Sequence, residues 1–262
     1  MTLANTDDTQ SGTSGSSLTV RPARSREELE QAYSLVYTTY HREGYVGEIG
    51  SKMRLSIYNA LPETVTFVAL DGGEVMATVS LVEDTELGLP MDALYKEELD
   101  ELREEGRKLS EVTMLAHREE ESRRDIPVFL QLMVQIFDYV LFLMHADDVC
   151  IAVHPHHAGF YEKWLLFERV GPEKQYPSVR NNPAIALRLD FRTVEDRYRE
   201  RDRLRRMFLC DRTPVQVMMN RYEMDFEDIQ YLFADKTPVL ANASEKQLEA
   251  LRRRFPEGAW NI

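Results

Sequence analysis

Apolar positions along residues 18–190 alternate between strand-like and helix-like spacing. Ser25 and Glu28 form a capping-box signal, and the residues after them are apolar along one helical stripe until Gly44. Farther on, β-branched runs flank a Gly-Gly turn and predict a hairpin. In order, the pattern predicts a strand at 18–20, helices up to 44 and over 52–60, strands at 64–70 and 74–82, a helix over 93–105, a strand at 109–116, a helix over 126–144, a strand at 149–153, a helix over 156–165 and a strand at 184–189. Such an order predicts an α/β fold, a mixed sheet with helices on both faces.

Two segments lie outside this pattern. Residues 1–17 are acidic, then rich in Ser, Thr and Gly, which is typical of a disordered leader and of neither a signal nor a transit peptide. After residue 190 the pattern is helical only, with helix-start signals at Thr213-Pro214, Asp225 and Ser244. The predicted organisation is a leader (1–17), an α/β domain (18–190) and a C-terminal α-helical extension (191–262).

Charge and cysteine usage restrict the partners and the cellular compartment that are expected for this protein. The net charge of -13 argues against nucleic acid as a partner. Between residues 192 and 206, however, seven arginines stand against four acids. This basic segment could dock an acidic partner, although a solvated helix with i,i+4 ion pairs is the favoured interpretation. Cys150 and Cys210 lack metal-ligand spacing and are interpreted as reduced, mostly buried thiols of a cytoplasmic protein.

The longest apolar stretch is interpreted as a core helix. It runs over residues 126–144 and is interrupted by Gln131, Gln135 and Asp138. A bilayer span would have to bury those polar groups, so we predict no transmembrane segment.

Several stretches resemble one family of enzymes. They are LVYTTYHREGYV (35–46), MRLSIYNALPETVTFVAL (53–70), LVEDTELGLPMDALY (81–95), LSEVTMLA (109–116), VHPHHAGFYEKWLLFERVG (153–171) and QYPSVRNNPAIALRLD (175–190). Their order and spacing resemble the GNAT acyltransferase superfamily and, within it, the long-chain N-acyl amino acid synthases, which are related to the acyl-homoserine-lactone synthases. The lactone synthases themselves are less similar, because they carry an arginine where this chain has Met114. The resemblance implies a GNAT-type fold and an N-acyltransferase.

The segment after the predicted strand 109–116 bears on the acyl donor. GNAT enzymes that use acetyl-CoA carry a glycine-rich loop there, whose amides hold the pyrophosphate. Residues 117–126 of this chain contain no glycine and four acids. The resemblance implies acyl carrier protein as the donor partner, with its acyl-phosphopantetheine (or acyl-CoA) as co-substrate and no permanently bound cofactor. Arg118, Arg123 and Arg124 could meet the single phosphate or the carrier's acidic helix, or else pair with Glu119–Glu121.

Glu111 is the candidate general base. It lies within the apolar run LSEVTMLA, where a carboxylate is unusual without a task, and the family resemblance implies a catalytic glutamate there. An amine with a pKa near 8 is largely protonated at neutral pH, so a base would raise its reactive fraction. Strand alternation predicts Glu111 and Thr113 on one face, and Val112 and Met114 on the other. The alternative is a strand-edge glutamate paired with Arg107 or Lys108.

Tyr161 and His157 are the other catalytic candidates. Tyr161 resembles the GNAT tyrosine that protonates the departing thiolate, although it could instead join the predicted core residues Phe160, Trp164 and Phe167. His157 matches the family's histidine before the Phe-Tyr pair, which implies a positioning role or a second base. We predict no metal site, because the proline between His154 and His156 prevents both from lying on one helix.

Substrate contacts follow from the matching stretches. An acceptor carboxylate would require an arginine, for which Arg42, Arg54 and Arg180 remain alternatives. Flexible methionines could line a tunnel for the acyl chain or form ordinary core, namely Met53, Met76, Met91, Met114 and Met133. The predicted substrate-binding residues are Thr113, Met114, Leu115, Arg118, Arg123, Arg124, Arg54 and Tyr45.

The function predicted is transfer of a fatty acyl group from a carrier thioester to the amine of an amino acid or a similar small amine. Two alternatives remain open at this point. One is a non-catalytic protein that binds an acyl group or a partner. The other is an acyl-CoA-dependent N-acetyltransferase, against which the absent glycine loop argues.

Overall fold

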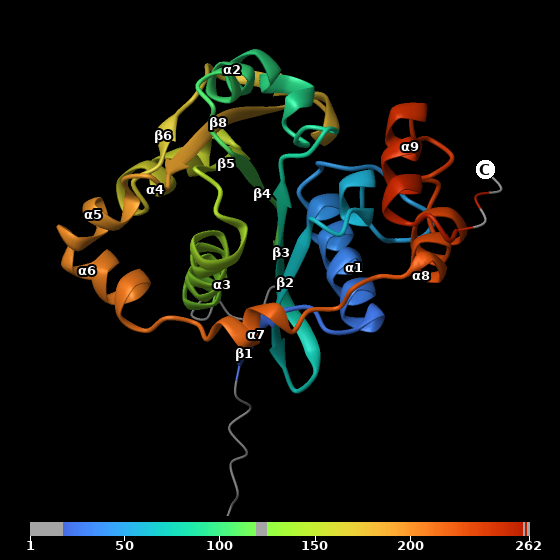
Figure 1. The fold of residues 1–262 in the computed structure, drawn as a ribbon, viewed down its shortest axis with the longest axis horizontal. Coiled ribbons are helices and arrows are strands. Elements are labelled where there is room, and N and C mark those ends of the chain that lie inside the picture. Colours follow the sequence, from blue (N-terminus) through green and yellow to red (C-terminus); the bar gives the residue numbers. More distant parts are fainter. Residues whose placement is uncertain (1–17, 119–124, 259, 261–262) are drawn as a thin grey trace, which may run out of the picture.

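A computed structural model describes residues 18–118, 125–258 and 260 of the chain. Its centre is a mixed, eight-stranded sheet in the order β1-β2-β3-β4-β5-β8-β6, with β7 paired to β8 (Figure 1). All neighbouring strands are antiparallel except β4 and β5. The strands are β1 (Thr19–Pro22), β2 (Val65–Asp71), β3 (Glu74–Glu83), β4 (Leu109–His117), β5 (Asp148–Val153), β6 (Glu168–Arg169), β7 (Lys174–Tyr176) and β8 (Asn182–Asp190). The predicted fold class is confirmed, and the predicted leader 1–17 lies outside the described residues.

Helix α1 (Arg26–Arg42) begins where its capping signal places it, and α2 (Asp92–Glu104) lies within one residue of the range predicted for it. Ser25 caps α1 by accepting a hydrogen bond from the Glu28 amide at 3.3 Å. The Glu28 carboxylate, however, binds Arg21 and the amide of Arg24. Glycines 72 and 73 form the turn between β2 and β3 with φ of 59° and 90°, a region that costs glycine little.

Helix α1 covers one face of the sheet, and α3 (Asp125–Tyr139) and α4 (Pro155–Trp164) cover the other. Helix α3 continues as a wide turn over Val140–Met144. The stretch Ile126–Met144 is long and apolar enough to cross a bilayer by length and composition alone. In this fold it packs on β2 and β3, and Leu132, Ile136, Phe137 and Val140 are buried in the same cluster as Phe67 and Val79. It is therefore a core helix, as predicted.

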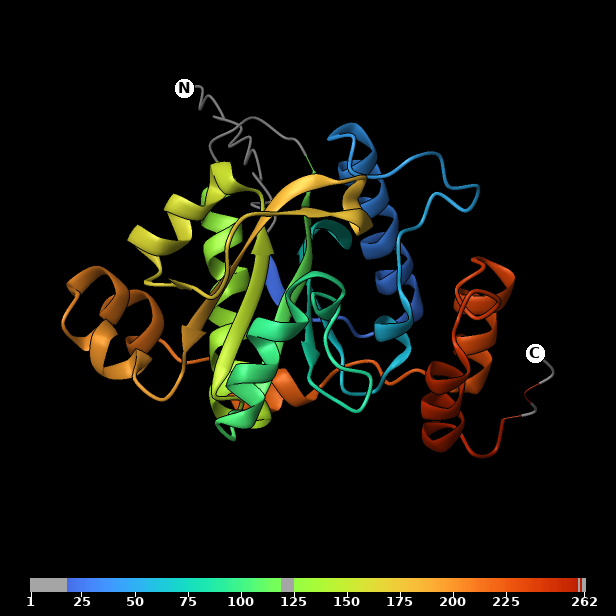
Figure 2. The same cartoon turned by 90° about the horizontal axis from the view of Figure 1, so that it is seen from above.

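The chain after β8 passes along both sides of the sheet. Helices α5 (Val194–Arg199) and α6 (Asp202–Leu204), followed by a wide turn at Arg205–Cys210, lie beside α3 and α4 (Figure 2). After α7 (Val215–Met219), the helices α8 (Phe226–Gln230) and α9 (Glu245–Arg254) pack near α1, at the other end of the molecule (Figure 2). Asp225 and Ser244 cap the last two helices, as their sequence signals predict.

Several local predictions were wrong. The helix expected over 52–60 is only a 3-10 turn at Ile57–Ala60, because the backbone of Ser56 just before the turn is extended, with φ of -131° and ψ of 171°. Trp164 was expected in the core but is 50% exposed, with the guanidinium of Arg203 4.3 Å from its ring centre. Cys150 is buried as predicted, whereas Cys210 is exposed. Strands β6 and β7 are too short to produce an alternation pattern.

Candidate active site

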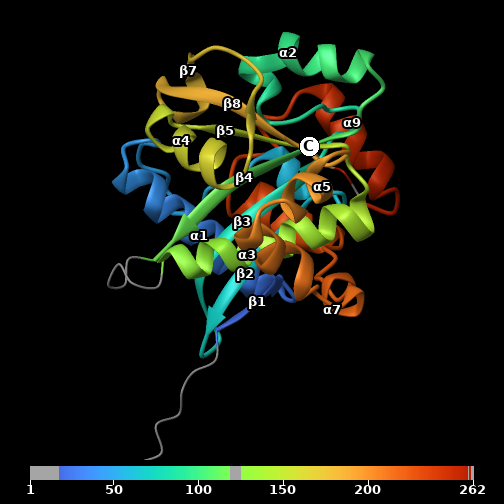
Figure 3. The same ribbon diagram turned by 90° about the vertical axis from the view of Figure 1, so that its left-hand side faces the viewer.

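A cleft opens where the two parallel strands separate. Strands β4 and β5 pair only between Leu109–Glu111 and Asp148–Cys150, although β4 continues to His117 and β5 to Val153 (Figure 3). The backbones beyond Glu111 and Cys150 therefore diverge, and a cavity of about 800 Å³ lies between them. This cleft is lined by residues from α1, β4, α3, β5, α4 and the start of β8.

A β-bulge shapes the β4 wall of the cleft. Thr113 pairs with Ser80 and Ala116 with Thr78, so Met114 and Leu115 together oppose the single residue Val79. Met114 has a φ of 56°, a conformation that costs energy for a residue other than glycine. The expected alternation, with Val112 and Met114 on one face, is wrong because of this bulge. Met114 packs with the buried residues around α1, here called the α1 cluster, whereas Val112 packs with those around α3, the α3 cluster. The α1 cluster includes Leu29, Ala32, Tyr33 and Val36, and the α3 cluster includes Leu132, Ile136 and Phe137. Bulges of this kind take backbone groups out of the regular ladder and re-aim side chains at functional sites.

Glu111 lies at the closed end of the cleft. Its side chain is only 2% exposed, and its Oε2 accepts a hydrogen bond of 2.7 Å from the Met91 amide. Burial raises the pKa of Glu111 to about 8, and the nearby Asp92 carboxylate adds to this effect. Arg107 pairs instead with Asp148 and Asp190, so the alternative of a surface Glu111–Arg107 pair is wrong. Glu111 is thus a buried carboxyl whose pKa is raised far enough that its protonated form persists at neutral pH.

Three tyrosines that sequence reasoning missed surround the same region. Tyr40, Tyr58 and Tyr176 line the cleft, and burial raises the pKa of the first two to about 12. Tyr176 donates a hydrogen bond of 3.2 Å to the Pro90 carbonyl, and Tyr58 donates one of 3.3 Å to the Leu89 carbonyl. These bonds tie the cleft wall to the segment that holds the Met91 amide against Glu111. All three tyrosines occur in the stretches that resemble the family, and that resemblance could have marked them as site residues.

Two of the three arginines considered for the acceptor carboxylate line the cleft. Arg54 lines the cleft with Tyr45, donates a hydrogen bond of 3.0 Å to the Ser178 carbonyl, and lies 5.4 Å from the ring centre of Tyr40. Arg42 also lines the cleft. Arg180 caps a short 3-10 turn in a left-handed conformation and is not among the described cleft residues.

The two other catalytic candidates also line the cleft. Tyr161 packs edge-on against Phe129 and Phe167, and burial raises the pKa of its phenol. His157 has a pKa below its ordinary value, chiefly through burial and then through the neighbouring His156 and His154. A neutral phenol and a neutral imidazole are therefore available at neutral pH. In the part of the chain that the structure describes, no three metal-binding side chains are grouped together.

Of the three predicted phosphate-binding arginines, Arg118 is described by the structure, and it does not line the cleft. Arg118 forms an exposed ion pair of 2.6 Å with Glu74 and is not among the described lining residues. Arg123 and Arg124 lie outside the described residues. By contrast, Thr113, Met114 and Leu115 all line the cleft, and their role in substrate binding stays a prediction.

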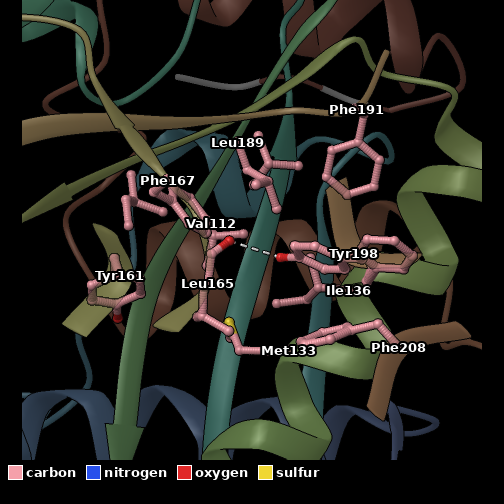
Figure 4. A pocket seen from close by; sticks show the side chains of 13 residues that line it. Val112, Met133, Ile136, Tyr161, Leu165, Phe167, Leu189, Phe191, Tyr198 and Phe208 are labelled. Atoms are coloured by element: carbon pink, nitrogen blue, oxygen red, sulfur yellow. Dashed lines mark hydrogen bonds between the residues drawn. The ribbon is translucent and has the colours of Figure 1, made fainter. Parts of the chain in front are cut away.

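Beyond the cleft, on the α3 side of the sheet, lies a small apolar chamber of about 30 Å³ (Figure 4). It shares Val112, Met133, Ile151 and Tyr161 with the cleft. Its other lining residues are Ile136, Phe137, Val149, Leu165, Phe167, Leu189, Phe191, Tyr198 and Phe208. Of the five methionines considered for a tunnel, Met114 and Met133 line the cleft, whereas Met53 is packed in the α1 cluster. The chamber is suited to an apolar group that enters from the cleft.

Fold and cleft together define an acyltransferase of the GNAT class. FeeM, an N-acyl amino acid synthase from uncultured soil microbes, is 30% identical, with a TM-score of 0.63 over 71% of this chain and 96% of that one. Two acyl-homoserine-lactone synthases have the same fold at 18% identity: LasI (TM-score 0.50, 67% of this chain and 91% of that one) and BjaI (TM-score 0.51, 75% and 100%). No curated protein matched the chain.

A family model matches residues 31–190 and is described as the N-acyl amino acid synthase FeeM. The chain belongs to this FeeM family of N-acyl amino acid synthases. The predicted N-acyltransferase class is confirmed.

Proposed function

We propose that this enzyme transfers a fatty acyl group from the pantetheine thioester of an acyl carrier protein to the α-amine of an amino acid. The observation that carries the proposal is the position of Glu111. It is a buried carboxyl in a cleft that has an apolar chamber on one side and an arginine-bearing wall on the other. The acyl tail would lie along the cleft with its end directed into the chamber, and the amino acid carboxylate would meet Arg54.

Glu111 would act as the general base. Its pKa of about 8 lies about one to two units below that of the α-ammonium group of a free amino acid, so moving a proton from the ammonium group to the carboxylate costs only about 2 kcal/mol. The neutral amine then attacks the thioester carbonyl. The backbone amides at the Met114 bulge are candidates for stabilising the resulting oxyanion.

Collapse of the tetrahedral intermediate breaks the carbon–sulfur bond and releases a thiolate. Burial raises the pKa of the Tyr161 phenol, so the group is neutral and holds a proton that can pass to that thiolate. The same burial makes the remaining phenolate a strong base, so it must be reprotonated at once. Because Glu111 already holds the first proton, the nitrogen loses its second proton to solvent as the amide forms. Solvent then returns one proton to the phenolate and takes up the proton held by Glu111. The net products are the N-acyl amide, the free thiol and one proton.

The carrier protein is proposed as donor because of the chain between β4 and α3. Residues 117–126 carry no glycine and four acids, so they lack the small residues that allow amides to approach a pyrophosphate closely. A carrier protein presents only a single phosphodiester, which needs fewer hydrogen-bond donors from the enzyme than the pyrophosphate of CoA does. Acyl-CoA is the alternative donor.

The test is to incubate the purified enzyme with an amino acid mixture and either acyl carrier protein or CoA loaded with the same acyl group. We expect N-acyl amino acids by mass spectrometry, formed faster from the carrier. Faster reaction with acyl-CoA would refute the donor assignment alone. If neither donor yields amide while the protein still binds fatty acid, the chain is a non-catalytic acyl-binding protein.

A further inference from the structure

The far wall of the apolar chamber is built by the C-terminal extension. Phe191, Tyr198 and Phe208 all lie after residue 190, where the match to the family model ends. In Figure 4 these three side chains lie across the chamber from Tyr161, which borders the cleft. An acyl chain that enters from the cleft would therefore reach the side chains of the extension last.

Tyr198 and Phe208 are held firmly in place. They are 1% and 3% exposed, and their ring centres are 5.1 Å apart. Each also packs on Phe137 of α3, at 5.5 Å and 5.2 Å respectively. The Tyr198 hydroxyl donates a hydrogen bond of 2.9 Å to the Leu165 carbonyl at the end of α4. The wall thus bridges the two helices that enclose the chamber.

Polar contacts fix the extension to α3 just after this wall. The buried carboxylate of Asp138 accepts a hydrogen bond of 2.9 Å from Arg212 and one of 2.7 Å from the Thr213 amide. Gln135 adds a hydrogen bond of 2.9 Å to the Thr213 hydroxyl. Charged hydrogen bonds to a buried carboxylate are among the stronger polar contacts, so the wall resists displacement by a ligand.

We propose that the C-terminal extension limits the length of the acyl chain this enzyme accepts, with Phe208 as the principal stop and Tyr198 beside it. This inference rests on the proposed acyl transfer. The chamber has an apolar lining and a remaining space of only about 30 Å³, so it favours methylene groups over water but ends at these rings. Each further methylene that can be buried strengthens binding about fourfold, which corresponds to about 0.8 kcal/mol. A chain too long for the chamber would lose this gain.

Phe208→Ala tests the proposal. Removing the ring should lengthen the preferred acyl chain by about two to four methylenes, because the lost side chain occupies the space of several such groups. Product chain lengths are measured by mass spectrometry with a mixture of straight-chain acyl carrier proteins. Independently of activity, the affinity of a series of straight-chain saturated fatty acids is measured by calorimetry with the full chain.

Phe233→Ala is the matched control. Phe233 is an equally buried phenylalanine of the extension, but it packs in the α1 cluster away from the chamber. It should lower thermal stability without moving the preferred chain length. Phe208→Leu is the second variant if Phe208→Ala does not fold, and it should give a smaller shift in the same direction.

The outcomes separate this inference from the proposed function. A shift in fatty acid affinity without amide formation supports the length limit and refutes the acyl transfer. Amide formation with the same preferred length in wild type, Phe208→Leu and Phe208→Ala overturns the length limit. An equal shift in the Phe233→Ala control also overturns it, since a general loosening of the fold would then be the cause.

Discussion

Glu111→Gln should make the protein more stable at alkaline pH while it removes the proposed base. Burial raises the pKa of Glu111 from an ordinary value of 4.5 to about 8. Between these two values the unfolded chain has already lost the proton that the folded protein retains. Folding must then take up a proton, so the stability that is fully present below pH 4.5 is progressively lost as the pH rises toward 8.

The size of the effect follows from the two pKa values. At about 1.4 kcal/mol for each pH unit, the shift corresponds to about 5 kcal/mol above pH 8 and to about 3 kcal/mol at pH 7. Glutamine carries no charge at any of these pH values, and its amide oxygen can still accept the hydrogen bond from Met91. The variant should therefore be more stable than the wild type by a few kcal/mol at pH 8, and close to equal at pH 5.

Urea unfolding of both proteins from pH 5 to pH 9 measures this difference, with Glu104→Gln on the exposed side of α2 as the matched control. In parallel, wild-type kcat/KM should rise with pH and level off at about 8, as the base loses its proton. A stability difference that is the same at pH 5 and pH 8 would refute the buried, proton-retaining carboxyl. Full turnover by Glu111→Gln would refute its role as base.

Three further substitutions test the remaining parts of the site. Tyr161→Phe keeps the ring packing but removes the proton donor, so kcat should fall about 100-fold with little change in KM; an unchanged kcat in steady-state assays would leave Tyr161 a packing residue. Arg54→Leu should raise the KM for an amino acid about 10- to 100-fold but leave the KM for an amine without a carboxylate unchanged. Arg42→Leu, the other arginine of the cleft, is the comparison variant. An equal rise in KM for both acceptors would contradict the assignment of Arg54 to the carboxylate. Asp148→Asn should lower the free energy of unfolding by about 3 kcal/mol, because Asp148 is a fully buried partner of Arg107 at the root of the cleft; a loss below about 1 kcal/mol in urea titrations would show that Asp190 alone suffices.

Most of the regular elements could be predicted because their signals are local. The Ser25 cap, the Gly-Gly turn and the helix starts at Asp225 and Ser244 each depend on residues within a few positions of one another. Failures occurred where the local signal is weak or misleading. Hydrophobicity suggested a buried Trp164, but the ring lies on the surface beside Arg203, a neighbour that only the path of the extension supplies.

The sequence by itself determined the sheet-forming runs, the family and the identity of the carboxylate within an apolar strand, because these depend on composition and order along the chain. Only the tertiary structure decided that β4 and β5 part beyond Glu111, and that a left-handed Met114 reverses the expected alternation. It also decided that rings from residues after 190 close the apolar chamber. The physical reason is that strand separation and burial are set by contacts between segments far apart in sequence, and no local periodicity records those contacts.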